Sequence, residues 1–383
     1  MISVFLSELR RVTSQKAAFS VLILSMILYA LFYPQPYLNE ALRNVPIAVV
    51  DKDGTATSRL FAQLIDATPD IEVANVLPDL VSAEREVYLR HTFGVLVIPQ
   101  HFERDLLHGR PSPVALYSDA SYFLLNQRMT IGVSAVAKTM GAEIETARLV
   151  NIGIDPVLAS AAADPMPLTA QPLFNPQGGY ATYILPAAFV LLLQQTLLIG
   201  VGLLGTLPGA VKGASAVSTV GGKLLAYSAL EVILLPAYLI VLPYLYGLPR
   251  LGSVPLILLL GIPFVLSVGA LGLVIAALFR KPLTVQLAMA AVGMPFMFLS
   301  GFSWPSEAIP PVVNVVARLL PSTSAIDGFV RISQLGASLY EVRADLLVLS
   351  TLAVVYTSTA VYLESRMSAR SPSAARSAAA DFA

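Results

Sequence analysis

The sequence predicts an α-helical integral membrane protein with six transmembrane helices and an inserted α/β domain, and three observations support this prediction. The 383 residues have a mean hydropathy of +0.73, and 13% of them are charged, where a soluble protein carries about 25%. The apolar residues gather in six segments close to the ~20 residues that a helix needs to cross a bilayer. A long polar stretch separates the first apolar segment from the other five.

The apolar segments are expected to be helices, because backbone groups in lipid must form their hydrogen bonds within their own segment. They comprise residues 17–33, 182–205, 224–246, 254–279, 283–302 and 346–363. The first segment follows basic residues, as a signal peptide does, but no small-residue cleavage site closes it. We therefore expect it to remain as an uncleaved transmembrane helix.

Basic residues near the helix ends predict the orientation, since cytoplasmic loops carry an excess of Lys and Arg. With six crossings, one side of the membrane receives Arg10, Arg11, Lys16, Lys212, Lys223, Arg280, Lys281, Arg366, Arg370 and Arg376. We therefore expect a multi-pass protein with both termini in the cytoplasm and the polar stretch outside it.

The polar stretch, residues 34–180, is expected to fold as a separate domain. It carries 16 of the 24 acidic residues and 10 of the 24 basic residues. Strand patterns at 45–50, 71–76, 93–98 and 114–117 alternate with helix patterns at 57–67, 80–90, 101–107 and 122–150. This alternation predicts an α/β layer with a mixed or parallel sheet.

The sequence thus divides into four parts. Residues 1–33 hold an interfacial helix and the first transmembrane helix, and residues 34–180 form the α/β domain. Residues 181–364 hold transmembrane helices 2–6, including a short re-entrant external hairpin near 303–324. Residues 365–383 are a small, polar cytoplasmic tail for which we expect no regular structure.

Composition and motifs argue against several other classes of protein. The equal numbers of acidic and basic residues argue against a nucleic-acid binder, and the absence of cysteine excludes disulfides and thiolate metal sites. Asp51 and Asp53 follow a strand and would suit a metal or acid–base site, but we favour the interpretation that they cap a turn before a helix. His91, His101 and His108 lack a metal-ligand spacing. We expect no catalytic residues, no metal and no cofactor.

Three sets of motifs point to a known family. The first is 45–53 (VPIAVVDKD) with 93–106 (FGVLVIPQHFERDL), and the second is Gly221-Gly222-Lys223. The third is 300–311 (SGFSWPSEAIPP), followed by 319–323 (LLPST). In their order and spacing they resemble permease subunits of ABC transporters, in the type-2 exporter (ABC-2) class with a large periplasmic domain between the first two transmembrane helices.

The resemblance implies a membrane-spanning permease subunit of an ATP-driven exporter in the bacterial inner membrane. A separate ATP-binding cassette subunit would supply the energy, and a second permease chain would complete the pathway as a homodimer or heterodimer. A periplasmic adaptor and an outer-membrane channel often extend the route. Members export drugs, lipids or similar amphipathic compounds.

The chain itself lacks a nucleotide-binding loop. A phosphate-binding loop needs Gly-x-x-x-x-Gly-Lys-Ser/Thr, but Leu224 follows Gly222-Lys223, and Val217 stands where the first glycine is required. If transport is driven by ATP, the energy must come from a partner.

Two segments are candidates for contact with that ATPase subunit. Residues 2–14 suit a helix lying in the headgroup region, with Val4, Phe5 and Leu9 on its apolar face and the charged residues elsewhere. The loop 206–222 corresponds to the family's coupling helix, but it departs from the usual charged pattern, so it could be a plain connector. The candidate contact residues are Glu8, Arg10, Arg11, Thr206, Lys212 and Lys223.

Polar residues within the apolar segments suggest a substrate pathway. Glu231 is costly in a membrane helix, so it is either a substrate or proton contact or a buried structural residue. Gln194, Gln195 and Gln286 could line a pathway or tie helices together. The candidate external gate comprises Phe302, Trp304, Pro305, Pro310 and Pro311, whose alternative role is a hairpin that only anchors helices.

The main alternative function is a membrane-anchored receptor or assembly scaffold that acts through the periplasmic domain. Polar residues within the membrane favour transport over a scaffold. An ion-coupled transporter is less favoured, because the sequence shows no repeated halves. A membrane enzyme is least favoured, because no catalytic constellation is present.

Overall fold

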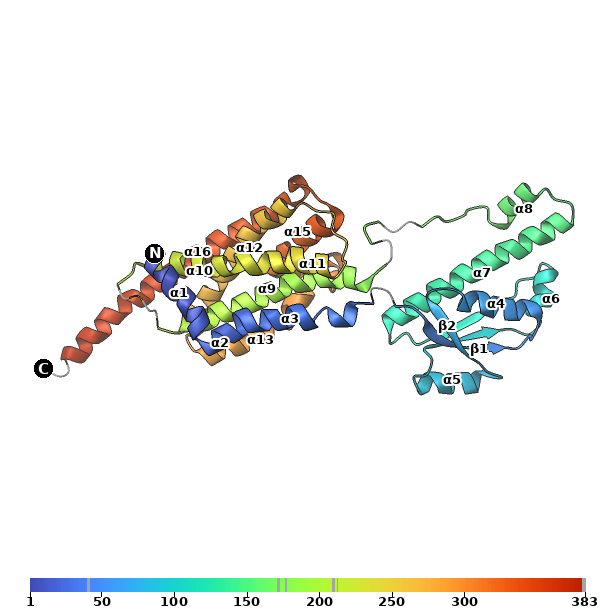
Figure 1. Cartoon of the computed structure of the whole chain (residues 1–383), viewed down its shortest axis with the longest axis horizontal. Coiled ribbons are helices and arrows are strands. Elements are labelled where there is room, and N and C mark those ends of the chain that lie inside the picture. The colour runs from blue at the N-terminus through green and yellow to red at the C-terminus, as the bar shows by residue number, and fades with distance from the viewer. Residues whose placement is uncertain (40–41, 171–172, 176–177, 209–210, 212, 381–383) are drawn as a thin grey trace. The chain divides into compact units, whose positions relative to one another are not determined.

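The structure, a computed structural model, describes residues 1–39, 42–170, 173–175, 178–208, 211 and 213–380, without the side chains of 294 and 369–380. The chain forms two compact units. The inserted unit comprises Ala41–Gln171, and the membrane unit comprises Met1–Glu40 and Pro172–Ala383 (Figure 1).

The inserted unit is built on a mixed four-stranded sheet. Its strands are β1 (Val45–Asp51), β2 (Ile71–Val76), β3 (Gly94–Ile98) and β4 (Ala115–Ser118), in the order β2-β1-β3-β4. The central strand β1 pairs in parallel with β2 and β3, and β4 pairs antiparallel to β3. The strand positions and the mixed sheet predicted from the sequence are confirmed.

Helices cover both faces of this sheet because side chains of β1 point alternately to opposite sides. Val45, Ile47 and Val49 pack with α4 (Ala56–Asp66), α6 (Phe102–Leu107) and α7 (Phe123–Asn151). Ala48 and Val50 pack with α5 (Leu80–Tyr88) on the other face. A further helix, α8 (Pro156–Ala163), follows α7, and the sequence reading did not identify it.

Five helical stretches among the described residues are long and apolar enough to cross a membrane, so the multi-pass prediction is confirmed. The first, Lys16–Tyr37, combines α2 (Lys16–Phe19), η1 (Ser20–Leu24), α3 (Ser25–Phe32) and η2 (Gln35–Tyr37). The second is α9 (Tyr180–Thr206), and the third combines α10 (Ala216–Pro236), η3 (Ala237–Val241) and α11 (Leu242–Leu245). The fourth is α12 (Val254–Phe279), and the fifth is the Leu339–Ser368 part of α16 (Leu339–Ala380).

The remaining predicted crossing, 283–302, corresponds to α13 (Pro282–Leu299). Its apolar stretch Pro282–Gly293 is shorter than a full crossing, so the count of six stays a prediction. At the other end of the sequence, α16 continues as a helix to Ala380, through residues for which we expected no regular structure.

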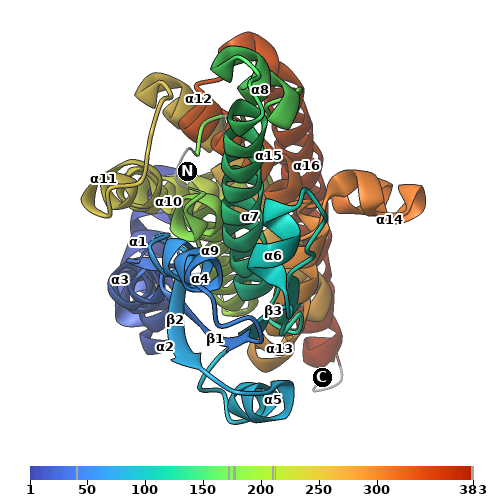
Figure 2. The ribbon, with the colours of Figure 1, turned by 90° about the vertical axis from the view of Figure 1, so that its right-hand side faces the viewer.

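Between α13 and α16 the chain forms η4 (Ser306–Ala308), α14 (Pro311–Ala317) and α15 (Pro321–Leu335). Figure 2 shows α14 projecting away from the other helices of the membrane unit. In contrast, α15 packs against α9, α12 and α16 and buries Phe329 and Ile332. The predicted hairpin near 303–324 therefore runs into a packed 15-residue helix.

Helix α9 is the best buried of the five spans, with 78% of its most apolar stretch inside the bundle. Close packing there depends on small residues: a Cβ atom at Gly200 would lie 2.3 Å from the side chain of Leu22. Alanine at position 200 would therefore clash with the first transmembrane helix.

The membrane unit has two distinguishable ends. The beginning of α9 lies beside the end of the first span, since the rings of Tyr37 and Tyr180 are 5.8 Å apart. The hairpin joins them there, because the Tyr183 hydroxyl bonds to the Phe302 carbonyl. We call this the hairpin end, and the chain leaves for the inserted unit and returns from it there. The opposite end, where α9 finishes, contacts α1 (Ile2–Ser14), and we call it the α1 end.

Candidate functional site

Helix α1 turns two charged residues toward the bundle. The sequence reading placed Glu8, Arg10 and Arg11 off the buried face, and this was wrong for two of them. Glu8 is only 1% exposed and Arg11 only 9%, whereas Arg10 is exposed. The physical reason is that the two buried charges satisfy each other and nearby polar groups, which removes most of the cost of burial.

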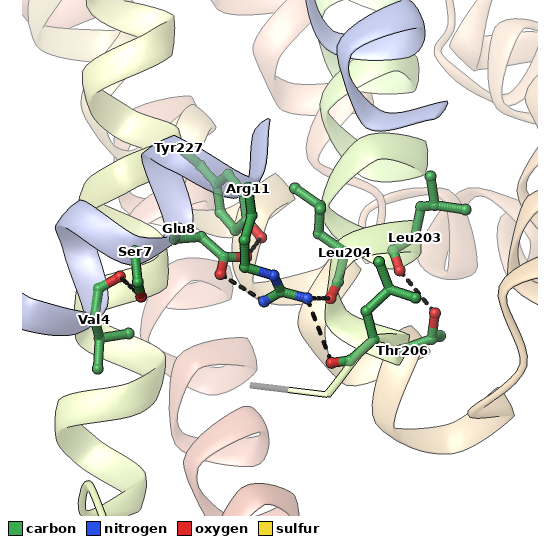
Figure 3. Close-up of polar contacts among 9 residues, drawn as sticks. Val4, Ser7, Glu8, Arg11, Leu203, Leu204, Thr206 and Tyr227 are labelled. Atoms are coloured by element: carbon green, nitrogen blue, oxygen red, sulfur yellow. Dashed lines mark hydrogen bonds and ion pairs between the residues drawn. The ribbon is translucent and has the colours of Figure 1, made fainter. Parts of the chain in front are cut away.

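These groups form a compact cluster (Figure 3). The Arg11 guanidinium lies 2.7 Å from a Glu8 carboxylate oxygen. The hydroxyl of Tyr227, on α10, donates to the other Glu8 oxygen at 2.5 Å. Arg11 also donates to the backbone carbonyl of Leu204 at 2.9 Å and to that of Leu207 at 3.4 Å, where α9 ends. We call Glu8, Arg11 and Tyr227 the elbow cluster.

The elbow cluster joins three helices that are distant in sequence. A cation at a helix C-terminus is favoured, because the last carbonyls lack partners within the helix and carry partial negative charge. Arg11 provides that cation for α9, while Glu8 connects α1 to Tyr227 on α10. Hydrogen bonds therefore connect α1 to both α9 and α10.

A close backbone approach strengthens the same joint. A Cβ atom at Gly222 would lie 2.7 Å from the Cβ of Val4 and 2.8 Å from the carbonyl oxygen of Met1. Only glycine allows α1 to lie this close to α10. The Gly-Lys motif of the sequence thus has a packing role at its second glycine.

The other candidate contact residues have different settings. Lys223 is only 7% exposed, and the Thr206 hydroxyl donates to the Leu203 carbonyl of its own helix at 2.7 Å. Lys212 lies outside the described residues. Among the described candidates, Arg10 has an exposed side chain, while Glu8 and Arg11 hold α1 in place.

Glu231 is buried at the α10–α12 contact. Leu224 and Leu235 of α10 both pack against glycines of α12. A Cβ atom at Gly269 would lie 3.1 Å from the Leu224 side chain, and one at Gly261 would lie 2.9 Å from the Leu235 side chain. Helical spacing places Glu231 on the same face of α10, between the two leucines. Its exposure is 3%, and neither carboxylate oxygen has a hydrogen-bond partner among the described residues.

The three glutamines differ in their surroundings. Gln195 donates to the backbone carbonyl of Met289 at 2.6 Å and so ties α9 to α13. Gln194 is 1% exposed, and its side-chain oxygen has no partner among the described residues. Gln286 is exposed on α13. A role of these residues in a pathway stays a prediction.

An aromatic contact connects the start of the hairpin to α9. The ring of Phe302 stacks on Tyr183 of α9, with ring centroids 4.6 Å apart, and the Tyr183 hydroxyl donates to the Phe302 carbonyl at 2.7 Å. The other gate candidates, Trp304, Pro305, Pro310 and Pro311, are exposed. Phe302 is thus the gate candidate that connects the hairpin to the bundle.

In the inserted unit, Asp51 and Asp53 stabilise the turn before α4. Asp51 accepts hydrogen bonds from the backbone N–H groups of Asp53 and Gly54, each at 3.0 Å. Asp53 accepts from the Thr55 hydroxyl at 2.6 Å and from the Glu103 N–H at 3.1 Å. Burial raises the pKa of Asp53, but these hydrogen bonds outweigh it and hold the pKa below its ordinary value. The turn interpretation is confirmed.

Two of the three histidines contact nearby protein groups. His91 lies 2.9 Å from Glu86, and His108 lies 2.7 Å from the Arg104 carbonyl. Within the part of the chain that the structure describes, no group of three potential ligands could hold a metal ion.

Sequence reasoning missed Tyr227 and Tyr183, because a lone tyrosine in an apolar helix gives no pattern. Their partners did give a signal. Glu8 and Arg11 are three residues apart, a spacing at which opposite charges meet on one helix face. Such a pair on an amphipathic helix can be buried as a unit.

These features define a multi-pass membrane protein with an inserted α/β unit and an N-terminal helix fixed to one end of the helix bundle. The chain belongs to the ABC-2 family: the model described as "ABC-2 family transporter protein" matches residues 16–362. The matched region begins after α1, so the elbow cluster combines two residues outside it with one inside it.

Two relatives illustrate the similarity. The chain is 28% identical over 101 residues to the "Probable multidrug ABC transporter permease YbhS" of Escherichia coli. This aligned region covers 26% of this chain and 27% of that protein. It is 24% identical over 327 residues to the "Linearmycin resistance permease protein LnrN" of Bacillus subtilis. This aligned region covers 78% of this chain and 82% of that protein. The match thus spans about a quarter of YbhS but most of LnrN.

Proposed function

We propose that this chain is the membrane-spanning subunit of an ATP-driven exporter that moves an amphipathic compound, such as a drug or a lipid, out of the cytoplasm or the inner membrane. The energy comes from a separate ATP-binding cassette subunit. The names of the relatives, which refer to multidrug transport and linearmycin resistance, support this substrate class.

The elbow cluster is the observation that carries the proposal. An ATPase subunit must move the transmembrane helices from the cytoplasmic side, which requires a rigid connection between its docking surface and the bundle. Helix α1 has that connection, because Glu8 and Arg11 bind it to α9 and α10. Arg10 is exposed on the same helix and is the residue that meets the ATPase subunit.

The α1 end then faces the cytoplasm, and the hairpin end faces the periplasm. The basic residues Arg10, Arg280 and Lys281 support this orientation, since all three are exposed and near helix ends. Helix α13 is the sixth crossing in this arrangement. Both termini are cytoplasmic, and the protein lies in the bacterial inner membrane.

The complete transporter contains a second permease chain, either another copy of this one or a sister chain. Glu231, Gln194, Gln195 and Gln286 contribute to the pathway, and the hairpin with Phe302 forms its external gate. The inserted unit lies in the periplasm, where an adaptor protein and an outer-membrane channel can extend the route.

Cysteine cross-linking tests the proposed docking site, because the natural chain has no cysteine to interfere. Arg10→Cys, labelled with a maleimide photo-cross-linker, is expected to form a cross-link with a candidate ATP-binding subunit. Glu72→Cys, at an exposed position of the inserted unit, is the matched control and should form none.

The reverse result would contradict the proposal. A cross-link from position 72 and none from position 10 would place the partner on the inserted unit and favour a receptor or scaffold. If neither position reacts and the two proteins do not co-purify, the exporter function is refuted.

A further inference from the structure

A polar cavity of about 450 Å³ lies at the hairpin end of the membrane unit. Its walls come from residues 300–307, α14, α15 and α16, and Phe302 forms part of one wall. The volume falls within the range of ordinary small-molecule sites. We call it the outer cavity.

Five ionisable side chains line the outer cavity: Glu307, Arg318, Asp327, Arg331 and Asp345. They are three carboxylates and two guanidiniums, so acidic groups are in excess. Arg331 lies 2.7 Å from Asp327, and both side chains of that pair are nearly half exposed. The charge of Asp327 is thus already matched by Arg331.

Asp345 lies in the buried part of the cavity, where the charges of Asp327 and Arg331 both act on it without an ion pair being formed. It is 8% exposed, and no ion pair or side-chain hydrogen bond joins it to another described residue. Gly328 of α15 packs beside it, since a Cβ atom at that position would lie 3.4 Å from the Asp345 Cβ. The close approach of α15 shields the carboxylate from the surrounding solvent but leaves it at the cavity wall.

A buried carboxylate without a partner is costly and favours a cation beside it. The cavity offers two further features that suit an organic cation. Phe302, whose ring stacks on Tyr183, is one of the lining residues, and aromatic rings attract ammonium groups. Ile326, Val330 and Val348 provide apolar surface for a hydrocarbon part. Carboxylate, aromatic ring and apolar wall together match an amphipathic amine.

We infer that the outer cavity binds the protonated amine of an amphipathic compound, with the Asp345 carboxylate as its counter-ion. The inference rests on the proposed function, because it makes this cavity the last binding site before release. It narrows the substrate class to compounds that carry a positive charge.

The probe is dansylcadaverine, which has a protonated primary amine at neutral pH, and its matched control is the neutral N-pentyl dansyl amide. Binding to the full chain is followed by dansyl fluorescence in nanodiscs of phosphatidylcholine, with empty nanodiscs subtracted. We expect the amine to bind about tenfold more tightly than the neutral compound. Asp345→Asn should abolish that preference, and Glu364→Gln on the same helix should keep it.

Equal affinity of the two compounds for the natural chain would overturn the inference, and this comparison needs no variant. A preference that survives in Asp345→Asn would overturn it as well. Val348→Trp, which fills the cavity, should remove binding of the amine even if Asp345→Asn does not fold. None of these measurements involves an ATPase subunit, so their failure is distinct from failure of the exporter function.

Discussion

Replacing Arg11 by alanine is expected to loosen α1 from the bundle. The change removes the ion pair with Glu8 at 2.7 Å and the hydrogen bonds to the carbonyls of Leu204 and Leu207. Of the partners that the described residues provide, the buried Glu8 carboxylate, 1% exposed, would then keep the Tyr227 hydroxyl alone. Removing one member of a buried ion pair costs about 3–5 kcal/mol, because the other charge stays buried without compensation.

Two further variants separate the contributions of individual interactions to this loss of stability. Tyr227→Phe removes a single hydrogen bond to a charged group and should cost about 1.5–3 kcal/mol. Adding Glu8→Ala to Arg11→Ala should recover part of the loss, because it removes the uncompensated carboxylate. Arg10→Ala is the control on the same helix and should change stability by no more than about 0.5 kcal/mol.

The assay is unfolding of the purified chain in mixed micelles with increasing sodium dodecyl sulfate, followed by far-ultraviolet circular dichroism. The reasoning requires the order Arg11→Ala, Tyr227→Phe, Arg10→Ala from most to least destabilised. If Arg11→Ala costs no more than Arg10→Ala, the elbow cluster does not hold α1, and the argument for force transmission is refuted.

Three further predictions concern other residues. Gly222→Ala should destabilise the contact between α1 and α10 by about 1–3 kcal/mol in the same assay, since the new Cβ would lie 2.7 Å from the Cβ of Val4. An unchanged unfolding midpoint would contradict the close approach of the two helices. Glu231→Gln should leave the unfolding midpoint unchanged or raise it, because its carboxylate oxygens have no hydrogen-bond partner among the described residues, and it should slow dye efflux from cells. A large loss of stability would contradict this expectation. The lowered pKa of Asp53 stabilises the folded inserted unit above about pH 4, and this contribution is lost as the pH falls through the lowered pKa. Asp53→Asn should therefore flatten the acid dependence of thermal unfolding, and an unaltered profile would contradict the role of its hydrogen bonds.

The sequence predicted the inserted unit well because its signals are local. The alternation of side chains along β1 and the turn at Asp51-Lys52-Asp53-Gly54 both depend on neighbouring residues. The apolar segments were equally clear, since length and composition define them. The extent of α1, Ile2–Ser14, also agrees with the amphipathic pattern.

The direction of the charged residues on α1 depended on distant partners. Glu8 and Arg11 are buried because groups about 200 residues later in the sequence form hydrogen bonds with them. These groups are the Tyr227 hydroxyl and the last carbonyls of α9. The hydrophobic periodicity of α1 alone places its charged residues on the solvent side, so it gave the wrong face for Glu8 and Arg11. The contact of Tyr183 with Phe302 was hidden for the same reason, since it joins two segments 119 residues apart.

The hairpin region was predicted only in outline. Prolines at 305, 310, 311 and 321 indicate breaks between helices, and the structure has short elements that begin close to them. The depth to which α15 is packed could not be read from its mixed composition. That burial depends on α9, α12 and α16 surrounding it.

The most direct test of the central claim is ATPase activity in lipid nanodiscs that contain this chain and a candidate ATP-binding subunit, compared with that subunit alone. The assay includes a panel of amphipathic drugs and lipids. The exporter account predicts a stable complex whose ATP turnover changes with at least one compound of the panel. Failure to form a complex with any ATP-binding subunit of the same cell would contradict it.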